Sequence, residues 1–395
     1  MSQFASLNYF LRSVRLISEF TVMVRHNWQS ESTKQFRINS LQIRILVLLS
    51  IAVFLGLIST CPNTTCHAEH TEDSQAEQIV TSAPTLSISQ EADGLTVKVD
   101  GQLFTRYLIK SGTRPVLWPV IGPTGDPLTR SYPVSKAEPG EATDHRHHRS
   151  IWVGYEGLNG VDFWHEPQAD HQRTFELGQT INRQFLKKTC QDNMAVIISQ
   201  NDWIDSQQKR VCEDVRTIYL GANARQRWID YQVVLNATDG PLQIGDSKEG
   251  FLAIRIASTM RVDANRGGKI ISSQGISNEK AWGKGACWVD YQGPVGDNLE
   301  GGNTLEGNTV GIAILSHPSS YRHPTRFHVR TYGLFAANPF GTLAFEKNPP
   351  EVTDRPLTTT VPSGGTLTLR YRIIFHRGDE KQARIAEQYA EYAAE

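Results

Sequence analysis

Trp228-Ile229-Asp230-Tyr231-Gln232-Val233-Val234-Leu235 is the segment that decides the fold class. Ile229, Tyr231, Val233 and Leu235 occupy alternate positions, as the buried face of a half-buried β-strand requires. Similar short runs recur on both sides of this segment, and Gly or Pro stands at nearly every junction. The predicted strands are residues 86–89, 95–99, 102–108, 116–120, 151–155, 195–199, 215–220, 228–235, 252–256, 310–315 and 367–375.

No helical pattern separates these runs, so the sequence predicts an all-β fold, a large antiparallel β-sandwich rather than a βαβ fold. A helix is predicted only at the end of the chain. Asp379 can cap it, and Gln382 stands at the spacing of a capping box. Ile385, Tyr389 and Tyr392 would share one face of that helix.

Composition restricts the class of partner. The 395 residues are 39% hydrophobic and 21% charged, which is enough for one large β-domain or two smaller ones. The formal net charge is -1, and the body of the chain has no long run of like charges. We therefore expect no nucleic-acid partner.

The N-terminal region has the features of a leader. Residues 45–58 form a mostly apolar run with the length of a signal-peptide h-region, which is short for a membrane span. Cys66-His67-Ala68 offers a cleavage site, so the mature chain would begin near Glu69 and be secreted or periplasmic. Two alternatives stay open: Met23 is the true start, or the run remains uncut and anchors the protein to a membrane.

These features predict three parts of the chain. They are a leader at 1–68, a polar linker at 69–84 and a single β-sandwich domain at 85–395.

Three cysteines follow the leader, which allows at most one disulfide bridge between them. Cys190 and Cys212 lie in neighbouring strand-like segments and are the candidate pair. The alternative is that these two and Cys287 are small buried hydrophobic residues. No cysteine-based zinc site is expected in the body of the chain.

Four segments contain candidate functional residues, and the first is the turn at residues 144–149. Its histidines are His145, His147 and His148. On an extended backbone the first two would point to one side and could bind a metal, whereas proton transfer needs only one of them. Arg149 can hold a carboxylate or sugar hydroxyls. The alternatives are structural or surface histidines and a surface ion pair.

The second segment is residues 245–255. Glu249, at the mouth of a predicted strand, suits a general base, and Lys248 can tune its charge. Gly250 would let the backbone turn tightly behind Glu249. Arg255 is expected to pair with Glu249 or Asp246. The alternative is a solvated turn of mixed charge.

The third segment is residues 280–291, where Trp282 and Trp288 stand near Asp290. Indoles stack on sugar rings and carboxylates accept hydrogen bonds from hydroxyl groups, so this combination suits a carbohydrate cleft. The alternative is that both tryptophans serve packing.

The fourth segment, residues 316–330, combines His317, His323 and His328 with Arg326. It begins at the end of a predicted strand, where binding residues often lie. We expect the turn near residue 147 and this segment to line one shared hollow together with Glu249. The alternative is a basic surface loop.

Several motifs together resemble a bacterial family labelled methane oxygenase PmoA-like, over about residues 86–375. They are Trp118-Pro119-Val120-Ile121-Gly122-Pro123, residues 144–150, Gly160-Val161-Asp162-Phe163-Trp164, Lys248-Glu249-Gly250 and residues 326–341.

The label itself conflicts with the sequence. The methane monooxygenase subunit spans the membrane several times, and each span needs about twenty apolar residues. No such run follows Ile58, and the mean hydropathy is -0.37. We therefore expect no methane chemistry.

The arrangement is instead similar to the galactose mutarotase-like supersandwich, in which two histidines, an aspartate and a glutamate move protons at a sugar ring. By residue type the matching set here is His145, His147 or His148, Asp290 and Glu249.

Three functional hypotheses follow. The first is an exported carbohydrate-active enzyme without a cofactor, with Glu249 as base and a histidine of the first turn as acid. Arg255 and Arg326 would hold the ligand, and Trp282 or Trp288 would stack on it. The second is a non-catalytic glycan-binding module of the cell envelope. The third is a metalloenzyme that binds a divalent metal through His145 and His147 with His317, His323 or His328.

Overall fold

The computed structural model describes residues 83–167, 175–191, 193–296, 309–346 and 357–395. The chain divides into two units, residues 1–79 and 80–395, and every described residue belongs to the second. The predicted leader, its apolar run 45–58 and most of the linker lie outside the described residues. In the part of the chain that the structure describes, no helix has the length and apolar character needed to cross a bilayer.

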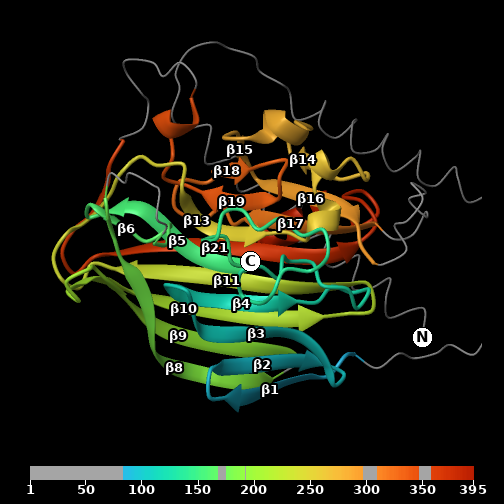
Figure 1. Ribbon diagram of the computed structural model, residues 1–395, viewed down its shortest axis with the longest axis horizontal. Coiled ribbons are helices and arrows are strands. Elements are labelled where there is room, and N and C mark those ends of the chain that lie inside the picture. The colour runs from blue at the N-terminus through green and yellow to red at the C-terminus, as the bar shows by residue number, and fades with distance from the viewer. Residues whose placement is uncertain (1–82, 168–174, 192, 297–308, 347–356) are drawn as a thin grey trace, which may run out of the picture. The chain divides into compact units, whose positions relative to one another are not determined.

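Two large sheets form the described unit, which confirms the predicted sandwich (Figure 1). The described part of the 13-stranded sheet has the main path β1 (Leu86–Glu91), β2 (Gly94–Val99), β3 (Gln102–Ser111), β4 (Arg114–Val120), β5 (Ile151–Leu158), β13 (Gly250–Arg255), β19 (Leu334–Asn338), β18 (Thr325–Val329) and β15 (Gly285–Ala286), with β6 (Val161–Asp162), β7 (Glu176–Leu177), β12 (Leu242–Ile244) and β20 (Thr359–Val361) beside it.

The described part of the 8-stranded sheet runs in the order β14 (Lys269–Ser272), β16 (Trp288–Pro294), β17 (Thr309–Ser316), β21 (Thr366–Arg377), β11 (Gln226–Asn236), β10 (Arg210–Ala222), β9 (Met194–Ile204) and β8 (Gln179–Gln191). Neighbouring strands pair antiparallel in both sheets, apart from the short parallel pair β6 and β7. Short 3₁₀ turns lie at Ser258–Met260, Val262–Ala264, Asn278–Ala281 and Leu343–Phe345.

The main hydrophobic core lies between the two sheets, because each strand sends alternate side chains inward. On β11, Ile229, Tyr231, Val233 and Leu235 are all at most 3% exposed, which confirms the period of two in the sequence. Aromatic contacts join the two sheets, as between Phe104 of β3 and Phe375 of β21. In Figure 1, β1 to β4 lie beside β8 to β11, and short contacts join β1, β3 and β4 to β8.

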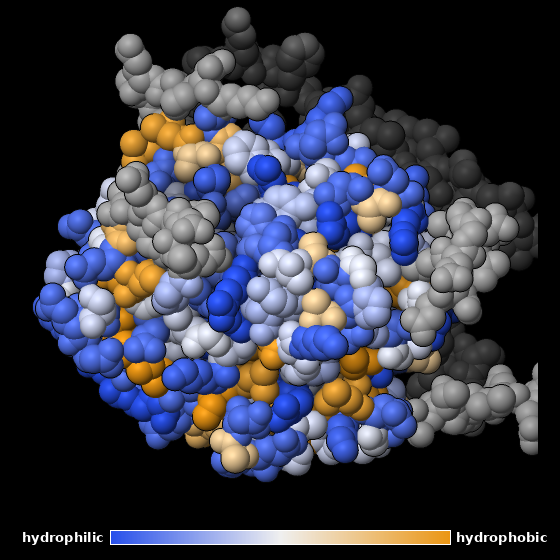
Figure 2. Space-filling view, viewed as in Figure 1, coloured by the Kyte–Doolittle hydropathy of each residue, from blue (hydrophilic) through white to orange (hydrophobic). Residues whose placement is uncertain are grey.

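We call the side of each sheet that faces away from the other sheet its outer face. The outer face of the 13-stranded sheet has its own small apolar cluster around Trp152, Trp164 and Leu334. Figure 2 shows one side of the molecule, where hydrophilic residues predominate and apolar residues form separate small groups.

Every predicted strand coincides with an observed one, and several strands were not predicted. The longest of these is β8, whose 13 residues are mostly exposed and polar, so it has no apolar alternation to detect. Strand β16 overlaps the segment interpreted as part of a carbohydrate cleft, β18 lies in the segment interpreted as a loop, and β19 lies in a family motif for which no strand was predicted. All three are almost entirely buried, and β18 and β19 have only five residues each, so they lack the exposed polar positions that mark a half-buried strand.

The predicted C-terminal helix is present as α3 (Ile385–Tyr392), with Ile385 and Tyr392 buried. The capping box also forms: the backbone N–H of Gln382 donates to Asp379 Oδ1 (2.8 Å), and that of Asp379 donates to Gln382 Oε1 (3.0 Å). The box closes a separate turn before α3, because Arg384, between this turn and the helix, adopts a left-handed conformation. Helix α3 packs on the outer face of the 8-stranded sheet.

Candidate functional site

A row of side chains crosses the outer face of the 13-stranded sheet. It separates two groups of predicted site residues, the histidine turn at residues 144–149 and the residues around Glu249 and His328. Trp152 on β5 lies opposite Ala253 on β13, which in turn lies opposite Ala336 on β19. His328 on β18 lies on the far side of Ala336. Since the two middle side chains are methyl groups, the indole and the imidazole stand at the two ends of the row.

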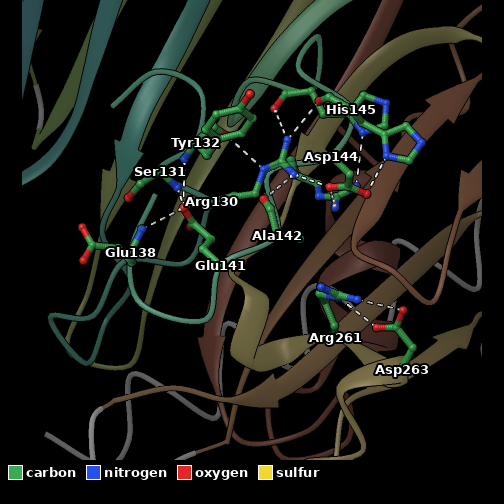
Figure 3. Close-up of polar contacts among 12 residues, drawn as sticks. Arg130, Ser131, Tyr132, Glu138, Glu141, Ala142, Asp144, His145, Arg261 and Asp263 are labelled. Atoms are coloured by element: carbon green, nitrogen blue, oxygen red, sulfur yellow. Dashed lines mark hydrogen bonds and ion pairs between the residues drawn. The ribbon is translucent and has the colours of Figure 1, made fainter. Parts of the chain in front are cut away.

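The histidine turn beside Trp152 is organised by one buried arginine (Figure 3). The side chain of Arg130 is fully buried and donates to Asp144 Oδ1 (2.7 Å). The same guanidinium donates to four backbone carbonyls of the loop, those of Tyr132, Ala142, His145 and His148. A planar guanidinium can satisfy this many acceptors at fixed angles, so it fixes the path of the loop.

The turn gathers His145, His147, His148 and the nearby His165 into what we call the imidazole cluster. The expected extended backbone is wrong here: His145 has a φ of 41°, and the N–H of His148 donates to its carbonyl (2.9 Å). The rings of His145 and His148 therefore stack at 4.8 Å between centroids, and those of His147 and His165 lie 4.7 Å apart.

Burial decides the charge of two of these histidines. Burial, and then the neighbouring ring of His165, holds the pKa of His147 far below its usual value. Burial and the ring of His147 do the same to the pKa of His148. Both rings are uncharged at neutral pH, so neither can act as an imidazolium acid in the proton-transfer hypothesis.

Buried polar atoms without a hydrogen-bond partner surround the imidazole cluster. In the described residues these include Nδ1 of His147 and the indole N–H groups of Trp152 and Trp164. The rings of these three residues lie within one aromatic group, with Trp152 and Trp164 at 5.1 Å. Such atoms are uncommon in folded proteins and mark a position where water or a ligand supplies the missing partner.

Asp144 connects this turn to β13. Arg255, whose side chain is 1% exposed, donates to Asp144 Oδ1 (2.8 Å) and approaches Nδ1 of His148 at 3.3 Å. The expected pairing of Arg255 with Glu249 or Asp246 is therefore wrong. Asp246 instead accepts the backbone N–H groups of residues 342–344. Partial burial opposes ionisation of Asp144, but Arg255 and His145 hold its pKa below its usual value.

At the other end of the row, Glu249 lies beside His328. Glu249 Oε2 is 3.8 Å from His328 Nδ1, and that nitrogen donates to the carbonyl of Lys248 (2.9 Å). Burial lowers the pKa of His328 to about 4, although Glu249 opposes the shift. His328 is therefore a neutral imidazole with its proton on Nδ1 at neutral pH. The Lys248 ammonium lies 3.2 Å from Glu249 Oε1 and is exposed.

Gly250, directly after Glu249, is required by packing. A Cβ at this position would lie 2.2 Å from the ring of Tyr155, so the backbone can approach β5 this closely only without a side chain. The N–H of Glu156 on β5 donates to the carbonyl of Glu249 (3.0 Å), which directly precedes β13.

Tyr332 links the two groups. Its ring stacks on His145 with the centroids 5.0 Å apart, and the guanidinium of Arg255 lies 4.9 Å from its centroid. Arg330 bridges Tyr332 and Trp282, at 5.6 Å from each ring. Burial raises the pKa of Tyr332 to about 12, and the charges of both Glu249 and Asp144 contribute to this shift. Ring and charge contacts through Tyr332, Arg330 and Trp282 therefore connect the first turn to the surroundings of His328 and Glu249.

Three further residues lie near the C-terminal end of β5 and were not among the predicted site residues. Glu156 on β5 pairs with Asp162 on β6, and His165 follows one turn later. One potential ligand atom from each of the three lies within 4.8 Å of the others. Among the described residues they form the only such group of three or more, and none belongs to the predicted metal set. The segment Val161-Asp162-Phe163-Trp164-His165 was the part of the sequence that could have indicated them, because it places an aspartate and a histidine three residues apart.

The fourth segment divides between the two sheets, so the predicted shared hollow is wrong for two of its histidines. His317 lies against Tyr392 and His323 against Tyr389, both of α3 (5.0 and 6.4 Å between centroids). The same separation removes the expected metal set of His145 and His147 with His317 or His323. Of the four residues predicted in this segment, Arg326 and His328, on β18, reach the outer face of the 13-stranded sheet.

Asp290 and Trp288 also lie apart from Glu249, because β16 belongs to the 8-stranded sheet. Trp288 packs on the outer face of that sheet, in the cluster that α3 covers. Asp290 accepts a hydrogen bond from His376 Nε2 (3.1 Å). The predicted grouping of Asp290 with Glu249 and the first turn is therefore wrong. His376 also lines a cavity of about 790 Å³, together with Arg225, Arg377 and Arg384.

Two predicted ligand-binding arginines are engaged with acids. Arg149 is buried and donates through Nε and Nη2 to the two carboxylate oxygens of Glu166, at 2.5 and 2.7 Å. Its role is structural in this arrangement. Arg326 binds Glu346 (3.0 Å) and the carbonyl of Gly283 (2.8 Å), next to Trp282.

The cysteines form no bridge in the described residues. Cys190 is exposed on β8 and Cys212 is buried on β10, with β9 between these two strands. The candidate pairing of Cys190 with Cys212 is therefore wrong.

Residues 94–390 match the model of a family of unknown function, DUF6807, and the chain belongs to this family. No curated protein matches the chain.

Proposed function

We propose that this is an exported carbohydrate-active protein that acts on a sugar or glycoside by general acid–base chemistry at the outer face of the 13-stranded sheet. The observation that supports it most is the partly buried carboxylate of Glu249 beside the neutral His328, next to Trp282 and Tyr332. A carboxylate in such surroundings suits a general base, and aromatic faces suit a sugar ring.

The acid partner fits His145 better than its buried neighbours. His145 Nδ1 lies 2.6 Å from Asp144 Oδ2, and both side chains are 41% exposed. Asp144 therefore fixes the ring orientation and directs Nε2 away from itself, as an acid needs. The Tyr332 phenol keeps its proton at neutral pH and can donate to a sugar hydroxyl, while Arg330 holds the rings of Tyr332 and Trp282 in place.

Resemblance adds support of a different kind. The motifs similar to the PmoA-like family include Lys248-Glu249-Gly250 and the turn at 144–150, both of which lie at this site. Two antiparallel sheets with histidines and a glutamate on one face are also similar to galactose mutarotase-like sandwiches. Export would follow if the run 45–58 is a signal segment.

The test uses the full chain with a panel of plant and algal saccharides. Ligand binding is read from the melting temperature, and products are read by NMR in D₂O. New reducing ends indicate hydrolysis, an unsaturated product indicates elimination, and deuterium incorporation indicates epimerisation. Glu249→Gln should lower turnover by about 100-fold or more while binding persists. The matched control is Glu387→Gln on α3.

Full turnover by Glu249→Gln would show that another group is the base. Binding without turnover by the wild-type protein would replace the enzyme with a non-catalytic glycan-binding module of the envelope. Absence of binding across the whole panel would overturn the sugar proposal.

A further inference from the structure

We propose that Glu156, Asp162 and His165 bind a first-row divalent metal ion such as Zn²⁺ or Mn²⁺, at a site that extends into the imidazole cluster. Each residue offers one ligand atom, and these atoms lie within 4.8 Å of one another. Two carboxylates and one imidazole form a mixed oxygen and nitrogen set, which suits these ions better than Ca²⁺ or Mg²⁺.

The local fold holds the three side chains in place. Glu156 and Asp162 face each other across the hairpin of β5 and β6, so their separation is set by strand pairing. The N–H groups of Trp164 and His165 donate to Asp162 Oδ1 at 2.8 and 3.0 Å. Those bonds turn the chain so that His165 Nδ1 lies 2.9 Å from Asp162 Oδ2.

Glu156 is held from the other side. The hydroxyl of Ser247 donates to Glu156 Oε2 (2.6 Å), and the same hydroxyl accepts the N–H of Glu249 (3.1 Å). Hydrogen bonds that orient a carboxylate in this way are typical of the surroundings of metal ligands. They also connect the proposed ion to Glu249, just before β13.

Charge and burial favour a cation here. Asp162 is only 2% exposed, and it approaches a second carboxylate within a few ångströms. Two carboxylates so close together repel each other, and a cation between them relieves this repulsion in addition to the nearby Arg114 guanidinium. A divalent ion would supply that charge and contact His165 as well.

A second observation points to the same place. His147 is 7% exposed, its ring lies 4.7 Å from that of His165, and its Nδ1 has no hydrogen-bond partner among the described residues. A buried imidazole nitrogen without a partner can complete a metal's coordination shell or bind a water on the metal. We therefore expect His147, which lies beside the three ligands and not among them, to bind a water on the ion.

The test measures metal binding without any sugar. The full chain is stripped with EDTA and titrated with Zn²⁺, Mn²⁺, Mg²⁺ and Ca²⁺ by calorimetry. We expect one site per chain for Zn²⁺ or Mn²⁺, and at least about 100-fold weaker binding of Mg²⁺ and Ca²⁺. Glu156→Gln and His165→Gln should each weaken binding by about 10- to 100-fold or more. His317→Gln, near α3, is the control and should bind normally.

Co²⁺ substitution provides an independent readout, because its absorption reports coordination by nitrogen and oxygen ligands. Loss of these bands in Glu156→Gln, with an unchanged circular dichroism spectrum, excludes misfolding as the cause. Absence of stoichiometric uptake by the wild-type chain would overturn the proposal and leave Asp162 and His165 as an ion pair. Unchanged affinity in both variants would also overturn it. Neither result depends on the proposed sugar activity, and absence of turnover would leave the metal affinity as it is.

Discussion

Asp290 and His376 form a buried pair on the outer face of the 8-stranded sheet, with Asp290 Oδ1 3.1 Å from His376 Nε2. The two residues lie on β16 and β21, the neighbours of β17 on either side, and Gly311 of β17 lies between them. A Cβ at Gly311 would come within 2.2 Å of the imidazole. The glycine therefore makes room for an ion pair across three strands.

This pair should make stability depend on pH. Burial opposes the charge of His376, but Asp290 more than compensates and raises its pKa above the usual value of about 6.5. The stabilisation is then complete below about pH 6.5 and is lost as the pH rises through the higher folded pKa. Asp290→Asn should lower the melting temperature at about pH 6 and flatten its dependence between about pH 6.5 and 9. An identical pH dependence in both proteins would contradict the assignment.

The pair of Arg149 and Glu166 should contribute strongly to stability. Both side chains are at most 7% exposed, and Arg114 approaches the same carboxylate at 3.7 Å. Glu166→Gln leaves the buried Arg149 without its counter-charge and removes one of the two acids near Arg114, so we expect a loss of about 3–5 kcal/mol in the free energy of unfolding. Urea denaturation measures it. Glu387→Gln breaks an exposed pair with Arg384 and should cost less than about 1 kcal/mol.

Arg130 should control the order of the histidine turn. Arg130→Lys keeps the charge but cannot reproduce the hydrogen bonds to Asp144 and the four carbonyls (Figure 3). We expect a loss on the order of 3 kcal/mol and faster amide exchange across residues 131–148. Arg261→Lys, at the more exposed pair with Asp263, is the control. Equal exchange in the two variants would show that the loop is held by other contacts.

The thiols should differ sharply in reactivity. Cys212 is fully buried and burial raises its pKa, whereas Cys190 is exposed. Native protein treated with iodoacetamide should be alkylated at Cys190 about 100-fold faster than at Cys212, as followed by peptide mass spectrometry. After unfolding without reductant, both should react fully. A peptide linking the two cysteines would contradict the absence of a bridge.

The fold could be predicted because its core strands alternate strictly, as β11 shows. Strand β8 could not, since an edge strand with two exposed faces needs no apolar residues. The proposed site draws only part of its residues from those that the sequence singles out. Glu249, His145 and His328 carry recognisable polar signals beside strands, but the sheet to which each strand belongs is a long-range property that residue types do not encode.

Asp290 illustrates that limit. Its neighbours in sequence suit a carbohydrate cleft, yet β16 pairs with β14 and β17 and so turns it toward the opposite side of the molecule. Conversely, Glu156, Asp162 and His165 were overlooked because their proximity depends on the hairpin of β5 and β6. Spacing in the sequence alone does not distinguish such a group from scattered surface residues.

Strand β18 alternates Phe327 and Val329, which face the core, with His328, which faces outward beside Glu249. A slip of one residue in its pairing with β19 would bring the imidazole between the two layers and expose the aromatic ring to water. The register of β18 and β19 that buries Phe327 and Val329 therefore also places His328 on the outer face. Tyrosine and tryptophan fluorescence during refolding would therefore report two events at once. One is the burial of the core side chains, and the other is the placement of His328 beside Glu249.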